Sequence, residues 1–90
     1  MPHLLLRRLM TEAVRGRVMA AVADVLYIDE SDLFDGDDTD LRELGLDSVR
    51  FVLLMKHLGV DRTSEVPARL AGDLTIAGWV RELESLRDTA

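Results

Sequence analysis

Few side chains in this sequence could take part in chemistry, and Ser48 is the best placed of them. It stands in the stretch Leu44-Gly45-Leu46-Asp47-Ser48-Val49-Arg50, where a long acidic segment ends and an apolar helical pattern begins. A residue at such a junction lies at a helix N-terminus, where free backbone N–H groups and the positive end of the helix dipole face solvent. A serine without a neighbouring base is a weak nucleophile, so another enzyme's active site would have to activate it. The position therefore indicates either a modification site or a serine that simply suits the start of a helix.

The histidines offer Ser48 no catalytic partner, and there is no cysteine. His57 follows Ser48 by nine residues on the same predicted helix, more than two turns away and out of reach of the hydroxyl. We expect His57 near the C-terminus of that helix, where a positive charge favours the dipole. Without cysteine, disulfides, thiolate nucleophiles and Cys-based metal sites are excluded. No catalytic triad, paired-carboxylate cleft or phosphate-binding loop can be assembled, so we predict that the chain is not an enzyme.

The acidic segment 28–47 invites a calcium-binding interpretation, which its spacing does not support. An EF-hand loop needs oxygen-bearing side chains at positions one, three and five, Gly at six and Glu at twelve. With Gly36 at position six, position three is Leu33 and position twelve is Arg42. We therefore predict no metal site.

Length and charge limit the possible partners. Ninety residues make one domain. The 17 acidic and 11 basic residues give a formal charge of −6, which argues against nucleic acid and favours basic protein partners. The apolar run Leu4–Leu6 is too short for a signal peptide, and no stretch approaches the roughly 18 apolar residues of a membrane span. We expect a cytoplasmic protein with no membrane partner.

Helical periodicity predicts the elements that must position Ser48. Apolar residues recur at helical spacing from Val14 to Val25, predicting a helix over 11–27, with residues 2–10 as its extension or as a loosely ordered arm. Residues 28–47 form a long connection that its apolar members would pin to the bundle, Phe34 among them. Within it, Asp40 followed by Glu43 resembles a capping box and indicates one helical turn at 40–44.

The second predicted helix, 48–58, begins after Asp47 as its N-cap and ends at Gly59. Its core stripe comprises Phe51, Leu54, Met55 and Leu58. Three further apolar residues widen this surface, which indicates either a docking surface for a partner or a helix buried on two sides. They are Val49, Val52 and Leu53.

Two more helices complete the prediction. A short helix over 64–71 requires Pro67 in its first turn. Thr75 caps a last helix over 76–86, with Leu86 facing inward and Trp79 partly so. The fold class is all-α: a four-helix bundle, three longer helices plus one short, with a long loop between the first and second. We expect an N-terminal leader or helix extension over 1–10, one domain over 11–87 and a frayed tail over 88–90.

The motif Gly45-Leu46-Asp47-Ser48-Val49-Arg50 is similar to the phosphopantetheine attachment motif of acyl, peptidyl and aryl carrier proteins. The helix order over about 11–87 also resembles theirs. Leu46-Asp47-Ser48-Val49-Arg50 looks most like the aryl carrier domains of siderophore-type nonribosomal synthesis. Thr75-Ile76-Ala77-Gly78-Trp79 resembles the Pro-Thr-Ile-x-x-Trp opening of their last helix, except that Leu74 replaces the usual proline.

The resemblance implies a cofactor and partners. A phosphopantetheinyl transferase would move 4′-phosphopantetheine from coenzyme A to Ser48 Oγ. An adenylating enzyme would load an amino or aryl acid as a thioester, and downstream condensation, tailoring or transferase enzymes would use it. The resemblance also implies that six residues contact these partners: Asp47, Val49, Arg50, Val52, Pro67 and Ala71.

The sequence thus predicts a freestanding peptidyl or aryl carrier protein of nonribosomal peptide synthesis, serving natural-product biosynthesis such as that of antibiotics. One alternative is a polyketide or fatty-acyl carrier, distinguished by the acid that loads it. The other is a non-catalytic helical interaction module without a covalent arm, which would bind its partner equally well with Ser48→Ala.

Overall fold

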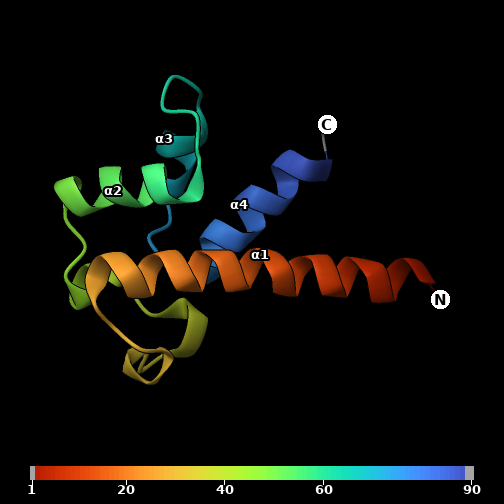
Figure 1. Ribbon diagram of the computed structural model, residues 1–90, viewed down its shortest axis with the longest axis horizontal. Helices are drawn as coiled ribbons and strands as arrows, with labels where there is room; N and C mark the ends of the chain where they lie inside the picture. The colour runs from red at the N-terminus through yellow and green to blue at the C-terminus, as the bar shows by residue number, and fades with distance from the viewer. Residues whose placement is uncertain (1, 89–90) are drawn as a thin grey trace.

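The computed structural model describes residues 2–88, and the side chains of 4–86. Its helices are α1 (Pro2–Leu26), α2 (Ser48–Leu58), α3 (Val66–Ala71) and α4 (Ile76–Asp88). The long helix α1 packs against both α2 and α4, and α3 packs against α4 (Figure 1). No strand occurs in the described part of the chain. The predicted all-α bundle of three longer helices and one short one is confirmed.

Trp79 lies at the centre of the core. Its side chain is fully buried, not partly as predicted. Its Nε1–H donates a hydrogen bond of 2.9 Å to the carbonyl of Leu70 in α3, and its ring meets Phe51 of α2 edge-on at 6.0 Å between centroids. One side chain of α4 thereby joins three helices. Leu86, predicted to face inward, is instead exposed.

The first turns of α1 are helical, so residues 2–10 extend the helix that was predicted over 11–27. Thr11, the first residue of the helix predicted over 11–27, lies inside α1, and its hydroxyl donates a hydrogen bond to the carbonyl of Arg7. These turns project beyond the other helices (Figure 1), and the leucines between Leu4 and Leu9 are exposed. At the other end of the chain, α4 continues to Asp88 past the predicted end at 86. Residues 89–90 of the predicted tail lie outside the described residues.

The connection between α1 and α2 contains three 3₁₀ turns, of which one was predicted. They are η1 (Glu30–Asp32), η2 (Gly36–Asp38) and η3 (Leu41–Leu44). Asp40 caps η3 as expected. Its carboxylate accepts hydrogen bonds from the backbone N–H and from the guanidinium of Arg42. Leu33, Leu41 and Leu46 are buried and pin the connection to the bundle, whereas Phe34 is 70% exposed, contrary to prediction.

Arg15 of α1 holds the connection from the helix side. Its Nε and Nη2 donate to the two carboxylate oxygens of Asp37, each at 2.8 Å, and Nη2 also pairs with Glu30. This contact joins residues 22 positions apart in the sequence. A two-pronged guanidinium–carboxylate contact has fixed geometry, which distinguishes it from an ordinary surface ion pair.

The pair also predicts acid sensitivity. Hydrogen bonding from Arg15 lowers the pKa of Asp37 below the ordinary value of 3.8. A carboxyl group with a lowered pKa in the folded state stabilises the fold above its unfolded pKa, and that stabilisation is lost as the pH falls through the folded pKa. We expect the free energy of unfolding to decrease when the pH is lowered below about 4. Arg15→Gln should remove the part of this decrease that Asp37 causes, which is no more than about 1 kcal/mol for a partly exposed pair. Urea titrations of both proteins at pH 3 to 7 check this, and parallel pH curves would contradict it.

Candidate functional site

The backbone around Gly45 places Ser48 at the start of α2. Gly45 follows η3 with φ +105°, a left-handed conformation that only glycine adopts without strain. The chain reverses there, so that Leu46 points into the core and Ser48 into solvent. Asp47 then caps α2 by accepting the backbone N–H of Arg50 at 2.8 Å. The predicted N-cap and the predicted start of the helix are both confirmed.

The hydroxyl of Ser48 is exposed, and no described residue forms a hydrogen bond with it. None of the other described serines is a free hydroxyl at the start of a long helix. Ser64 donates its hydroxyl to the carbonyl of Asp61, and Ser31 lies within the short turn η1. Ser48 is therefore a free hydroxyl on the first residue of an 11-residue helix.

Asp47 and Arg50 form an ion pair beside Ser48. Arg50 Nη1 lies 2.7 Å from a carboxylate oxygen of Asp47. The pKa of Asp47 is lowered, chiefly because its carboxylate accepts the backbone N–H of Arg50 and also because the guanidinium attracts it. The carboxylate is thus ionised at neutral pH and already engaged. A partner protein that contacts these two residues therefore contacts an ion pair and not two free charges.

Two open hollows flank the first turns of α2. The α2–α3 hollow, about 410 Å³, is mostly apolar, and Ser48 lies at its rim. Its lining residues are Arg42, Leu46, Asp47, Ser48, Phe51, Val52, Ala71 and Leu74. The α1–α2 hollow, about 770 Å³, lies on the other side of α2. It is lined by Asp24, Val25, Tyr27, Asp47, Val49, Arg50, Leu53, Lys56 and His57.

The structure divides the residues predicted to contact partners between these two sides. Val52 and Ala71 line the α2–α3 hollow with Ser48, while Val49 and Arg50 line the α1–α2 hollow. Pro67 lines neither hollow; it is half-buried in the first turn of α3, as its chemistry required. Val49, Val52 and Leu53 are 69%, 43% and 48% exposed, so the surplus apolar surface of α2 faces solvent instead of a second core.

Sequence reasoning missed that Leu46, Phe51 and Leu74 join Ser48 in one apolar wall. Phe51 lies one helical turn after Ser48, which the i, i+3 spacing could have indicated. Leu46 and Leu74 come from separate segments, and the backbone bond from Leu41 N–H to the carbonyl of Leu74, 2.9 Å, brings those segments together. No local pattern reveals such a contact.

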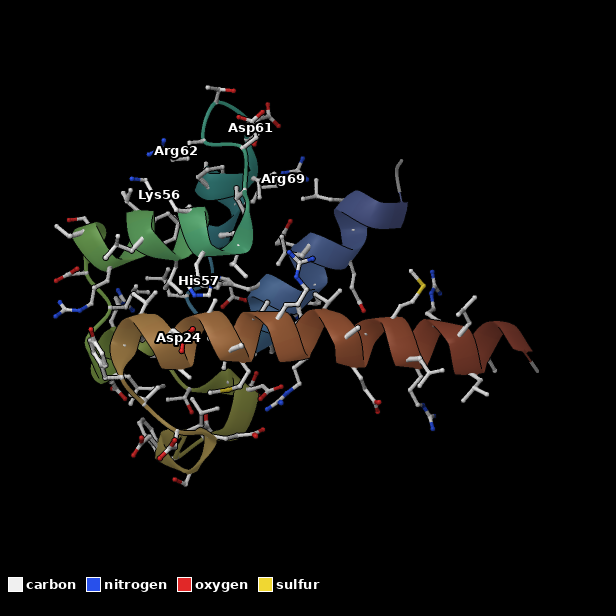
Figure 2. All side chains as sticks on the ribbon, in the orientation of Figure 1. Asp24, Lys56, His57, Asp61, Arg62 and Arg69 are labelled. Carbon is white, nitrogen blue, oxygen red and sulfur yellow. The ribbon has the colours of Figure 1, made fainter. Side chains whose placement is uncertain are left out.

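His57 lies away from Ser48, in the last turn of α2 as predicted. Its Nε2 is 3.1 Å from Asp24 of α1, and the two side chains face each other across the helices (Figure 2). Within the described residues, no group of three or more His, Asp or Glu side chains is placed to hold a metal ion. The described helices also include none with the length and apolar character to cross a bilayer.

Comparison with known proteins gives a consistent match. A family model described as "Phosphopantetheine attachment site" matches residues 16–83. Acyl carrier proteins of Mycobacterium tuberculosis and Mycobacterium bovis are each 71% identical to this chain over 73 residues, which is 81% of this chain and 94% of each relative. Acyl carrier protein MmaB of Mycobacterium marinum is 72% identical over 74 residues, 82% of this chain and 89% of the relative. No solved structure matches the chain.

Proposed function

The chain belongs to the family of phosphopantetheine-dependent carrier proteins, and from this premise we propose that Ser48 is the residue that carries the arm. Members of the family are carriers and not catalysts, and they hold 4′-phosphopantetheine covalently. They work with phosphopantetheinyl transferases and acyl-handling enzymes. When bound, the arm supplies a terminal thiol on which an acid is held as a thioester.

The setting of Ser48 carries this proposal. Its hydroxyl is exposed, makes no hydrogen bond within the described residues, and starts a helix whose cap fixes its position. A transferase can therefore reach Oγ without unfolding the helix. The positive end of the α2 dipole favours the phosphate that would join there, and Arg50 balances the negative charge of Asp47 nearby. The residues present thus fit the group.

For the cargo we propose an acyl group. The α2–α3 hollow begins at Ser48 and is walled by Leu46, Phe51, Val52, Ala71 and Leu74. Its volume of about 410 Å³ lies within the range of small-molecule sites. An alkyl chain folded back into it would gain about 25 cal/mol for each Å² of apolar surface removed from water. The names of the relatives, all acyl carrier proteins, support the same cargo.

The second candidate cargo is an amino or aryl acid, delivered in nonribosomal peptide or other natural-product synthesis. What favours it is the resemblance of Leu46-Asp47-Ser48-Val49-Arg50, and of the opening of α4 around Trp79, to aryl carrier domains. An adenylating enzyme would then supply the acid, and condensation, tailoring or transferase enzymes would receive it. We propose the cytoplasm as the place where the carrier meets these enzymes.

One experiment tests attachment and cargo in sequence. The protein is incubated with coenzyme A, magnesium and a broad-specificity phosphopantetheinyl transferase, and its intact mass is measured. A gain of one phosphopantetheine unit is expected, and none from a folded sample would overturn the proposal. The arm is then charged separately with a medium-chain acyl group and with an aromatic acid. The NMR chemical shifts of the backbone amides of Val52 and Ala71 are then compared between the two loaded forms. Larger changes in the acyl form favour the acyl cargo, and larger changes in the aromatic form favour the amino or aryl acid.

Val52→Asp tests the role of the α2–α3 side. Val52 is 43% exposed, so the fold should tolerate the change, while a charge at the rim of an apolar surface repels an apolar ligand or partner. We expect enzymatic loading of the arm to slow by about tenfold or more, equivalent to about 1.4 kcal/mol. The measurement is the rate of acyl transfer to the modified protein. Phe34→Asp, on the exposed part of the connection, is the control, and equal rates for both variants would exclude Val52 from the interaction.

A further inference from the structure

A second hollow adjoins the α2–α3 hollow at the end away from Ser48. It has a volume of about 280 Å³ and a mostly polar lining, and we call it the far hollow. Its lining residues are Asp40, Arg42, Ala71, Gly72, Asp73, Leu74 and Thr75. Three of them also line the α2–α3 hollow: Arg42, Ala71 and Leu74. The two hollows together form one groove that is apolar beside Ser48 and polar at its far end.

Arg42 stands where the lining changes from apolar to polar. Its Nε and Nη2 donate hydrogen bonds of 3.1 and 2.8 Å to the carboxylate of Asp40, which lines the far hollow and not the α2–α3 hollow. The guanidinium therefore lies on the polar side of the boundary. A guanidinium carries N–H donors on every nitrogen, and Nη1 of Arg42 makes no hydrogen bond to any described residue. Its donors thus remain available at the entrance of the far hollow.

Asp73 supplies a fixed acceptor in the far hollow. Its Oδ1 accepts a hydrogen bond of 2.9 Å from the hydroxyl of Thr75, and its Oδ2 accepts one of 3.0 Å from Nη2 of Arg81. The carboxylate also lies over Gly78, where an added Cβ would collide with it. These contacts hold Asp73 at the start of α4. Each carboxylate oxygen can accept more than one hydrogen bond, so Asp73 can still receive a donor from a ligand.

We propose that this carrier prefers an acyl chain whose distal end carries a hydroxyl group. The proposal rests on the acyl cargo proposed for Ser48 and names the class of acyl group. The hydrocarbon part of such a chain fits the apolar walls, and the hydroxyl fits the far hollow because it both accepts and donates hydrogen bonds. Its oxygen accepts a hydrogen bond from Arg42, and its hydrogen is donated to Asp40 or Asp73.

Two other kinds of chain end fit the far hollow less well. An unsubstituted chain would displace water from two carboxylates and a guanidinium without replacing the hydrogen bonds that the water makes. A terminal carboxylate could bind the guanidinium, but the far hollow holds two carboxylates for one guanidinium, and like charges repel. A hydroxyl is neutral and replaces both kinds of hydrogen bond. The polarity of the groove thus distinguishes the three chain ends.

A series of acyl chains on the phosphopantetheine arm tests the proposal. Chains from octanoyl to hexadecanoyl are attached in three forms, ending in a methyl, a hydroxyl or a carboxylate group. The NMR chemical shifts of the backbone amides are compared with those of the unacylated form. Gly72 and Thr75 line the far hollow and not the α2–α3 hollow, and the reverse holds for Val52. We expect hydroxyl chains of at least one length to change the shifts of Gly72 and Thr75, and methyl chains of that length to change the shift of Val52 alone.

Cleavage of the thioester by hydroxylamine measures the size of the preference. A chain held in the groove keeps its thioester against the protein, so cleavage slows as the chain spends more time bound. We expect the hydroxyl form to be cleaved about threefold to tenfold more slowly than the methyl form of the same length, the effect of about one hydrogen bond. Equal rates would overturn the preference. Slowest cleavage of the carboxylate form would overturn it in favour of a dicarboxylic acyl group.

Arg42→Met removes the guanidinium and keeps an unbranched side chain. The Arg42 side chain is 68% exposed, and the bond from its backbone N–H to Asp40 remains, so the fold is not at risk. We expect the difference in cleavage rate between hydroxyl and methyl chains to disappear. Arg69→Met is the matched control, because Arg69 is also an exposed arginine paired with a carboxylate, that of Glu65, and lines neither hollow. Equal cleavage rates in the two variants would overturn the role of Arg42.

Val52 separates this inference from the proposed function. If no chain of any form changed the amide shift of Val52, the acyl cargo itself would be wrong, and the preference for a hydroxyl with it. If every chain changed the shift of Val52 and the three forms behaved alike at Gly72 and Thr75, the acyl cargo would stand and only the preference would be overturned.

Discussion

Replacing Ser48 with Ala is expected to abolish the gain of a phosphopantetheine unit completely, while the rest of the protein is unchanged. The hydroxyl oxygen is the only atom that this substitution removes from the side chain, and no described residue uses it for a hydrogen bond. Alanine is also well tolerated in the first turn of a helix whose cap is the preceding residue. Intact mass after incubation with coenzyme A, magnesium and the transferase measures the result directly.

Ser64→Ala is the matched control, because Ser64 is also an exposed serine of the same chain and should leave the mass gain intact. The helical circular dichroism of Ser48→Ala must equal that of the wild type, so that loss of modification is not loss of fold. A mass gain that persists in Ser48→Ala would assign the arm to another residue. If the protein shows no mass gain and still binds a partner with undiminished affinity, it would instead be a helical interaction module.

Trp79→Ala is expected to have the largest effect on stability, lowering the free energy of unfolding by about 3–5 kcal/mol. The side chain is fully buried, its indole N–H is hydrogen-bonded to Leu70, and its ring contacts Phe51. The substitution therefore opens a cavity where three helices meet and removes the 2.9 Å hydrogen bond to the Leu70 carbonyl, which keeps only the longer bond of 3.4 Å from the backbone N–H of Asp73. Small domains have only about 5–15 kcal/mol of stability in total. Urea unfolding followed by circular dichroism measures the change.

Trp79→Phe separates the hydrogen bond from the packing. It keeps an aromatic ring in the core and removes the donor to Leu70, so we expect a smaller loss, about 1–3 kcal/mol. Because Phe51 shares the contact with Trp79 and also lines the α2–α3 hollow, Trp79→Ala should disturb that hollow as well. Equal stability of Trp79→Ala and the wild type would show that the three helices are held together elsewhere.

The features that local chemistry determines were predictable from the sequence. Asp47, Thr75 and Pro67 all stand at helix starts, because a short polar side chain can cap free N–H groups and proline can occupy a first turn without loss. The start of α2 then placed Ser48 correctly. The carrier family followed from a short motif in the right position, and its match over residues 16–83 confirms that interpretation.

The features that depend on distant contacts were not predictable. Trp79 is fully buried because α3 presents a carbonyl to it, and Phe34 is exposed because its neighbours Leu33 and Leu41 occupy the core instead. The apolar wall beside Ser48 combines segments that are adjacent only after folding. Periodicity reports which residues are apolar, but not which of several apolar residues the other helices will cover.

The contact between α1 and α4 has a consequence for how the protein is made. The first and last helices of the described fold pack against each other, so the core cannot close while the chain is still being synthesised up to α4. Contacts of such long sequence separation also slow folding, because the intervening chain must be ordered first. Ser48 is translated near the middle of the chain. It becomes the first residue of a fixed helix only once α4 has emerged from the ribosome, so a transferase that requires the folded domain cannot act before α4 is available.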